Sequence, residues 1–224
     1  DGTSNLDVID VDGAADFAAD VTFANGADII TASAGTSNFR AGVNAGNSIA
    51  SGGNYNTVVG DEAGTAITTG DNNTAVGYQA GAGTVTTGSS SFFGYQAGLV
   101  SDAPGNNFFG YAAGAATTSG LNNVAMGNLA LYTNVDGDDN TAIGSNALRN
   151  LEPADGSSYN TAVGSQAGFT VTTGVRNTLI GGLSGYAMTT GDRNVAVGAT
   201  SLDACTEGQY NVAVGNDALT TLTT

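Results

Sequence analysis

Side chains that could carry out acid–base, nucleophilic or metal chemistry are few in this chain. Its 224 residues include no histidine and no lysine, and its only basic side chains are four arginines. Without histidine there is no Ser-His-Asp or Cys-His arrangement and no histidine-containing metal site. Without lysine there is neither Schiff-base chemistry nor the lysine of a phosphate-binding loop. Carboxylates therefore remain as the groups that could act in catalysis or bind a metal.

Paired carboxylates could hydrolyse a glycan, because glycosidases need only two acids at a suitable separation. Nothing but charge singles out the acidic pairs of this chain, however, and acidic side chains are mostly solvent-exposed in proteins. We therefore predict that the protein is not an enzyme and name no catalytic residue. The pairs considered are Asp61-Glu62, Glu152 with Asp155, and Asp203 with Glu207.

One acidic cluster is a candidate for calcium. Asp136, Asp138 and Asp139 stand around Gly137, and hard cations favour clustered carboxylate and carbonyl oxygens. The segment matches neither an EF-hand loop nor the nonapeptide calcium repeat. No other cofactor is expected.

Charge and cysteine content limit the possible partners. The net charge of -16 makes binding to a nucleic-acid backbone electrostatically unfavourable. Cys205 is the only cysteine, so no disulfide framework is possible, and we expect it to be a small apolar filler. No run of 18 apolar residues occurs, so we expect no membrane insertion. Because the chain starts at Asp1 rather than methionine, we expect a processed protein or a fragment of a longer one.

A short repeat accounts for most of the sequence. Its clearest copy is NTAVGYQAG, residues 73–81, and seven of the ten intervals between aligned copies are 17 residues long. Repeats of this length are typical of stacked coils rather than of a globule with one centre. We predict an all-β fold, a parallel β-solenoid or β-roll of about eleven coils over residues 38–224. Residues 1–37 are predicted to form an N-terminal extended β segment that is shaft-like or contacts other chains. The aligned glycines are Gly42, Gly60, Gly77, Gly94, Gly110, Gly127, Gly144, Gly164, Gly181, Gly198 and Gly215.

From Gly60 onward the two residues before each aligned glycine are apolar, as in Phe92-Phe93 and Phe108-Phe109. Neighbouring side chains of a strand point to opposite faces, so both faces should be covered. One face would pack inside the coil, and we expect the other to pack against copies of the chain, most simply in a homotrimer. The alternative is a wider monomeric solenoid, but the adjacent phenylalanine pairs would then expose a large aromatic patch.

Asparagine recurs at the start of the repeat. Stacked coils would align these side chains in one structural ladder that bonds along the stack and to turn backbone. The glycines should form bends with positive φ. The ladder residues are Asn56, Asn73, Asn123, Asn140, Asn160, Asn177, Asn194 and Asn211. In four coils leucine replaces a later glycine, and we expect it to point inward; these are Leu131, Leu148, Leu202 and Leu219.

The other half of the repeat holds Thr-Thr-Gly in several coils. Threonine favours strands, so we expect a second strand or its edge there. A regular threonine array could also bind ice, but here it is interrupted. The longest interval, between Gly144 and Gly164, indicates a loop extruded from the stack. Its candidate contact residues are Leu151, Glu152, Pro153 and Asp155.

The Asn-Thr-Ala-Val-Gly unit with its following alanine resembles the head repeats of trimeric autotransporter adhesins, which form left-handed parallel β-rolls in homotrimers. The longer unit, residues 73–88, is still more similar to the repeat regions of tailed-bacteriophage tail fibre proteins, and residues 2–13 resemble shaft segments of such fibres. The resemblance implies a structural fibre or adhesion protein, on a virion surface or extracellular, that presents receptor-binding loops to a host surface glycan or protein. Alternatives are a bacterial surface adhesin or extracellular filament subunit and, more remotely, a glycan-degrading tailspike or an ice-binding protein.

Overall fold

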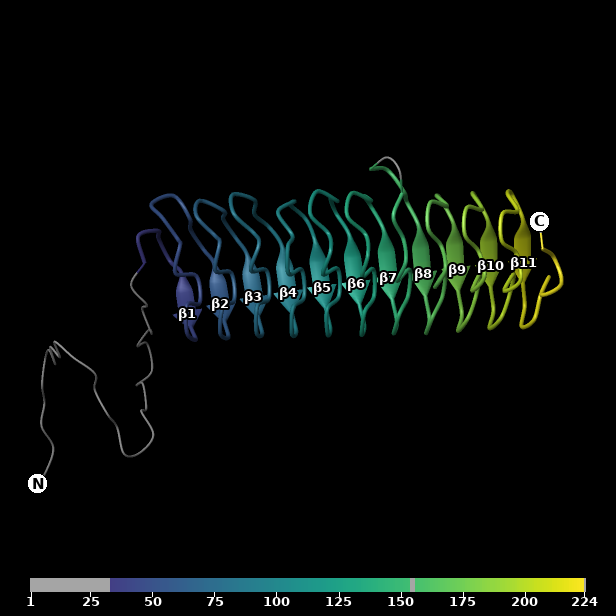
Figure 1. Cartoon of the computed structure of the whole chain (residues 1–224), viewed down its shortest axis with the longest axis horizontal. Coiled ribbons are helices and arrows are strands. Elements are labelled where there is room, and N and C mark those ends of the chain that lie inside the picture. The colour runs from purple at the N-terminus through teal and green to yellow at the C-terminus, as the bar shows by residue number, and fades with distance from the viewer. Residues whose placement is uncertain (1–32, 154–155, 224) are drawn as a thin grey trace, which may run out of the picture.

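The chain forms a β-solenoid. The computed structural model describes residues 33–153 and 156–223, which wind into about ten turns that carry eleven short strands. Figure 1 shows the turns stacked in a single row from β1 to β11. The all-β parallel solenoid with a spacing of roughly 17 residues, predicted from the repeat, is confirmed. The strands are β1 Phe39–Ala41, β2 Thr57–Val59, β3 Thr74–Val76, β4 Ser91–Phe93, β5 Asn107–Phe109, β6 Val124–Met126, β7 Thr141–Ile143, β8 Thr161–Val163, β9 Thr178–Ile180, β10 Val195–Val197 and β11 Val212–Val214.

The eleven strands pair in parallel, in sequence order, to make one sheet along the stack. The register is unshifted, so that the middle residue of each strand lies opposite the middle residue of the next, as Ala75 does with Phe92. Each repeat position therefore forms a straight column along the solenoid. Of the predicted segment 1–37, only residues 33–37 are described; they form bends, and the Thr36 nitrogen donates to Asn54 Oδ1 at 2.9 Å. Its other residues lie outside the described part of the chain.

The prediction of a second strand in each coil is wrong. The described residues form one sheet of eleven strands, and the Thr-Thr-Gly segments contain bends but no strand. These segments still bond to the next coil through a few backbone hydrogen bonds, such as Thr172 N to Thr189 O at 2.9 Å and Gly174 N to the same oxygen at 3.3 Å. Bonds that converge on one carbonyl support an extended path but no paired ladder, so the preference of threonine for strands is met without a second sheet.

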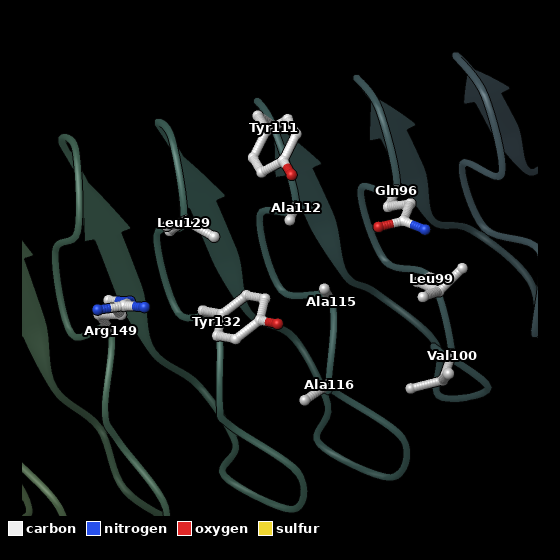
Figure 2. A pocket seen from close by; sticks show the side chains of 10 residues that line it. All are labelled: Gln96, Leu99, Val100, Tyr111, Ala112, Ala115, Ala116, Leu129, Tyr132 and Arg149. Carbon is white, nitrogen blue, oxygen red and sulfur yellow. The ribbon is translucent and has the colours of Figure 1, made fainter.

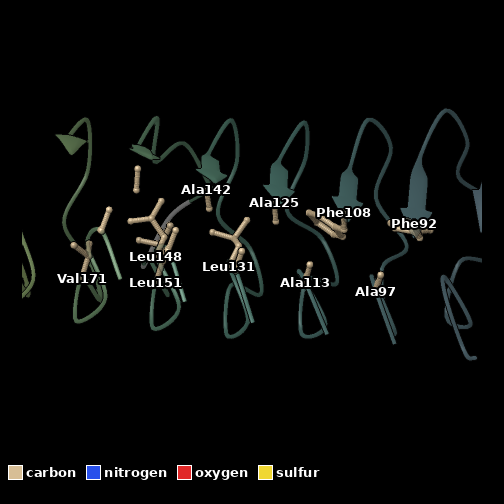
Figure 3. Packing of buried hydrophobic residues seen from close by; sticks show 14 of the residues in the cluster. Phe92, Ala97, Phe108, Ala113, Ala125, Leu131, Ala142, Leu148, Leu151 and Val171 are labelled. Carbon is tan, nitrogen blue, oxygen red and sulfur yellow. The ribbon is translucent and has the colours of Figure 1, made fainter. Parts of the chain in front are cut away.

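The core is the column of middle strand residues and the side chains that face it across the coil (Figure 3). Phe92, Phe108 and Leu179 are at most 1% exposed. Cys205 belongs to the same buried cluster, which confirms its predicted role as an apolar filler. At the N-terminal end the inward position of β1 is taken by Arg40, which is partly buried and whose Nε donates to Ala45 O at 2.8 Å.

Large and small side chains alternate between two facing columns of the core. Where the strand carries phenylalanine, the facing position is glycine: a Cβ added to Gly114 would lie 2.4 Å from the Phe108 ring. Where the strand carries alanine, leucine fills the facing position in several coils, and Figure 3 shows Leu131 between Ala125 and Ala142. Interdigitation of this kind keeps a narrow interior at native packing density.

The predicted inward leucines follow this rule in three of four coils. Leu131, Leu148 and Leu202 are fully buried, although each takes a positive φ that disfavours a bulky side chain. Leu219 is 45% exposed. The prediction is wrong for Leu219, which follows β11, the last strand of the described residues.

The aligned glycines make the bend that ends each strand, with φ between +124° and +141°, as their positive φ was predicted to allow. Side chains are excluded there for two reasons. Residues with a Cβ rarely adopt this conformation, and a Cβ at Gly77 would lie 2.5 Å from the carbonyl oxygen of Gly94 in the next coil.

The eight asparagines assigned to a structural ladder occupy one column. Asn177 represents them: its backbone nitrogen donates to Asn160 Oδ1 at 2.9 Å and its Nδ2 donates to Gly191 O at 2.7 Å. Its own Oδ1 accepts from the backbone nitrogen of Asn194 at 2.9 Å. The Asn177 amide thus joins its own coil to the next and also fixes a turn.

Three further residues continue the asparagine column. Asn38 and Asn106 are buried in it, and Ser90 replaces asparagine in the coil of β4. The Ser90 nitrogen donates to Asn73 Oδ1 at 3.2 Å, and Ser90 Oγ accepts from Asn106 N at 3.3 Å. A hydroxyl therefore keeps the acceptor chain intact.

Candidate functional site

The acidic cluster proposed for calcium does not gather into a ligand set. Asp138 Oδ1 accepts a hydrogen bond from the Leu121 nitrogen at 2.7 Å, and Asp136 accepts one from the Ser119 hydroxyl. Asp139 Oδ1 accepts one from Asn122 Nδ2 of the preceding coil at 3.3 Å. Within residues 33–153 and 156–223, no group of three or more His, Cys, Asp or Glu side chains is placed to hold a metal ion. Each carboxylate bonds separately to the preceding coil, and calcium binding there stays a prediction.

The acidic pair Asp61-Glu62 is also engaged in stacking. Asp61 Oδ1 accepts from the Val43 nitrogen at 3.1 Å, and Glu62 Oε2 accepts from Gln79 Nε2 at 2.6 Å. These carboxylates connect neighbouring coils on the surface, so their contacts account for them without catalysis.

The longer connection between β7 and β8 extends beyond the neighbouring turns on both sides of residues 154–155 (Figure 1). Leu151 was predicted to be a contact residue there, but it is fully buried in the core, and Pro153 is buried too. Glu152 is exposed. Asp155 lies outside the described residues. The prediction is wrong for Leu151 because its position in the repeat is the inward one that Val171 occupies in the following coil.

Although Glu152 is exposed as a residue, partial burial of its carboxyl group raises the pKa, an effect opposed by the hydrogen bond from Val135 N and reinforced by the nearby charge of Asp136. A carboxyl whose pKa is raised by folding stabilises the fold while it is protonated, and that contribution is lost as pH rises through the folded-state pKa. Glu152→Gln should therefore raise the melting temperature slightly at pH 7 and leave it unchanged at pH 4. Differential scanning fluorimetry of both proteins at both pH values measures this; a larger gain at pH 4 would contradict it.

The outer face of the sheet is apolar and partly exposed. The last residue of each strand points away from the core, and Met126 is 42%, Ile180 38% and Phe93 36% exposed. Phe93 stacks on Phe109 with ring centroids 4.9 Å apart. From β2 to β11 neither outward position of any strand carries a charge. We call these residues the outer stripe; its last-residue column is Val59, Val76, Phe93, Phe109, Met126, Ile143, Val163, Ile180, Val197 and Val214.

A second feature is a surface hollow of about 470 Å³, formed by the segments that follow strands β4 to β7. Figure 2 shows Ala115 and Ala116 lying between larger side chains of neighbouring coils, Leu99 on one side and Tyr132 on the other. Two small residues in a column of larger ones create the depression. The lining residues are Gln96, Leu99, Val100, Tyr111, Ala112, Ala115, Ala116, Leu129, Tyr132 and Arg149.

Aromatic rings border this hollow. Tyr111 ends a row of stacked rings, with its centroid 5.1 Å from that of Tyr95. On the other side, Arg149 lies between two rings, its guanidinium carbon 5.8 Å from the Tyr132 centroid and 5.7 Å from the Phe169 centroid. Arg149 Nε is buried and has no hydrogen-bond partner in the described structure. The hollow thus combines apolar walls, tyrosine edges and one guanidinium, which suits binding rather than bond cleavage.

Sequence reasoning did not identify Tyr111, Tyr132 or Arg149 as functional. A signal was present in the repeat alignment, because Ala115 stands at the position that holds Leu99, Tyr132 and Phe169 in other coils. Its meaning depends on the coils being stacked, since residues about 17 apart then become neighbours.

No family model, curated protein or solved structure matches this chain. The described residues include no helix long and apolar enough to cross a membrane.

Proposed function

We propose that this chain is a structural fibre or adhesion protein, a segment of a homotrimeric rod on a virion surface or in the extracellular space that presents contact surfaces to a host. The outer stripe is the observation that carries the proposal. In a chain with 24 charged residues, 20 of them acidic, an uncharged face along the whole sheet indicates a surface that is covered. Copies of the chain are the simplest cover, because they carry the same stripe with the same spacing.

The dimensions of the outer stripe support self-association. Strands lie about 4.8 Å apart in a sheet, so eleven strands span roughly 50 Å. A strip of this length and about 10 Å width approaches the largest apolar patches found on monomers, about 300–600 Å². A threefold axis parallel to the stack would let three such strips meet along their full length, and the stacked Phe93 and Phe109 would supply the aromatic part of the contact.

The repeat itself supports a structural role. Straight columns of buried asparagine, glycine and apolar residues bond each coil to the next, and such an assembly forms a rod of constant cross-section. The carboxylates Asp61, Glu62, Asp136, Asp138 and Asp139 serve the same stacking. A glycan-degrading enzyme is less well supported, because the hollow is lined by no carboxylate and the pair Asp61-Glu62 is engaged in contacts between coils.

Charges introduced into the outer stripe should dissociate the assembly. In Met126→Asp/Ile180→Asp, six carboxylates would be brought close to a threefold axis, where burying them unpaired is costly. Light scattering coupled to size-exclusion chromatography should give three times the 21.9 kDa chain mass for the native protein and the mass of a single chain for the variant.

The matched control is Asn128→Asp/Gly182→Asp, which adds the same charge in the same two coils, two residues beyond the stripe. Asn128 is exposed, and a Cβ on Gly182 meets only Ser165 O at 3.9 Å. The control should keep the native mass. A native protein that is monomeric at micromolar concentration would contradict the proposal directly.

A further inference from the structure

We propose that the hollow beside Tyr132 and Arg149 binds a sugar ring that carries a carboxylate, such as a uronic acid unit. This inference rests on the proposed attachment function and deepens it by naming a ligand class and a site. It is carried by the charge, the shape and the edge groups of the hollow.

The charge of the hollow is opposite to that of the chain. The protein has 20 acidic residues and four arginines, yet the hollow is lined by one arginine and no acid. Arg149 has no acceptor for its buried Nε within the described structure, and the rings of Tyr132 and Phe169 hold its guanidinium in place. A guanidinium binds a carboxylate through two parallel hydrogen bonds. Although Nε is buried, Arg149 as a residue is partly exposed, and an external carboxylate would supply an acceptor for the exposed part of its guanidinium.

The walls of the hollow suit a ring with one apolar face. Ala115, Ala116 and Leu99 supply aliphatic surface, and the side of Tyr111 away from Tyr95 is not covered by another ring of its row. Such a lining is typical of small-molecule sites, where a few polar groups fix the orientation of a largely apolar contact. At about 470 Å³, the space lies within the usual range of ligand sites.

The edge groups favour hydroxyls over a purely aromatic acid. Figure 2 shows the hydroxyls of Tyr111 and Tyr132 on the side of Leu99 and Ala115. The side-chain Nε2 of Gln96 donates a hydrogen bond to Gln79 Oε1 at 2.8 Å, and Figure 2 shows the side-chain oxygen of Gln96 turned toward Ala112. Neutral donors and acceptors around an apolar floor match the hydroxyls of a sugar ring. An open site of this kind should bind a single ring with a dissociation constant on the order of 1 mM, given the low binding energy per atom of typical ligands.

The test uses the full chain in its native assembly and a ligand-observed NMR titration. The probes are methyl β-glucuronide, methyl β-glucoside, which has the same ring without the carboxylate, and benzoate, which has the carboxylate without hydroxyls. The glucuronide should bind at least tenfold more tightly than either of the others. An oligouronate of three units distinguishes the source: tighter binding than the monosaccharide indicates a polymer, and equal binding indicates a single terminal or free unit.

Two variants and one control localise the site. Arg149→Gln should weaken glucuronide binding roughly tenfold or more, the value of a hydrogen bond to a charged group, and Ala115→Leu should abolish binding by filling the hollow. Arg193→Gln removes an arginine that lies over the Tyr210 ring in the same way, 5.4 Å from its centroid, but outside the hollow. It should leave binding unchanged.

The proposal would be overturned if the glucoside or benzoate bound as tightly as the glucuronide. It would also be overturned if Arg193→Gln lost as much glucuronide affinity as Arg149→Gln. Light scattering on the same samples separates this result from the fibre proposal, because the native mass depends on the outer stripe and not on the hollow. A trimer that binds no glucuronide would contradict the proposed binding site but not the fibre proposal.

Discussion

Exchanging the sizes of two facing core residues, by Phe108→Ala together with Gly114→Leu, is expected to destabilise the solenoid much less than the two single substitutions added together. The double variant recreates in the coil of β5 the pairing that the next coil already has, Ala125 with Leu131. Leucine at this position tolerates positive φ in native coils, with φ of 53° at Leu131. The interior volume is thus nearly kept.

Each single substitution should be costly for its own reason. Phe108→Ala leaves a cavity where a fully buried ring stood, at a cost of about 3–5 kcal/mol. Gly114→Leu places a side chain whose Cβ alone would lie 2.4 Å from that ring, and overpacking costs about 1–3 kcal/mol. Because the cavity left by the first is filled by the second, the coupling energy should reach about 2–3 kcal/mol.

Urea unfolding of the native protein, the two single variants and the double variant measures this coupling, with all four at one protein concentration because assembly contributes to stability. The reverse exchange, Ala125→Phe with Leu131→Gly, is the matched control and should show coupling of the same sign. Additive effects in both cycles would mean that the facing columns do not share volume.

Replacing one asparagine of the ladder, by Asn177→Ala, is expected to cost about 2–5 kcal/mol. The substitution leaves the Gly191 carbonyl and the Asn194 nitrogen without their partners, and each buried polar group left unpaired costs about 1–3 kcal/mol. Asn177→Asp should be worse at neutral pH, because it keeps the acceptor but replaces the donor to Gly191 O with a buried negative charge. Asn177→Ser should be milder, since Ser90 preserves the same column in the coil of β4.

The control for the ladder is Asn211→Ala in the coil of β11. Asn211 is only partly buried, and because no ladder residue follows it, few bonds would be lost; we expect a change below about 1 kcal/mol. Urea midpoints compared at pH 7 and pH 4 test the order, since protonation should bring Asn177→Asp closer to the alanine variant. A cost at Asn211 equal to that at Asn177 would show that the ladder does not act through buried bonds.

Much of the fold could be predicted because a fixed repeat gives each position the same environment in every coil. The apolar pair before each glycine indicated a strand with an inward and an outward face, and the structure places Ala75 inward and Val76 outward. The environment of Leu219 was harder to predict: it matches Leu202 in sequence but lies after β11, the last described strand, and is exposed. The single strand per coil was also missed, because threonine preference does not reveal how many neighbours a segment will pair with.

The candidate site residues likewise fall into those that sequence spacing identified and those that it misjudged. The asparagine column and the inward leucines were evident in sequence, since their spacing alone places them in register. Leu151 was misjudged because a loop was inferred from a long interval, whereas its side chain occupies an inward position of the repeat. The acidic residues Asp136, Asp138 and Asp139 were grouped by proximity in sequence, but each bonds to a different group of the preceding coil.

The sequence by itself determined the period, the parallel stacking and the identity of the buried columns, because these depend on local pattern repeated many times. Only the tertiary structure decided what the surface offers. The hollow exists because Ala115 and Ala116 lie beside Tyr132 and within reach of Arg149, residues that are separated by one or two whole coils along the chain. Stacking brings together side chains that differ between repeats, and a binding site arises at such differences and not in the repeat itself.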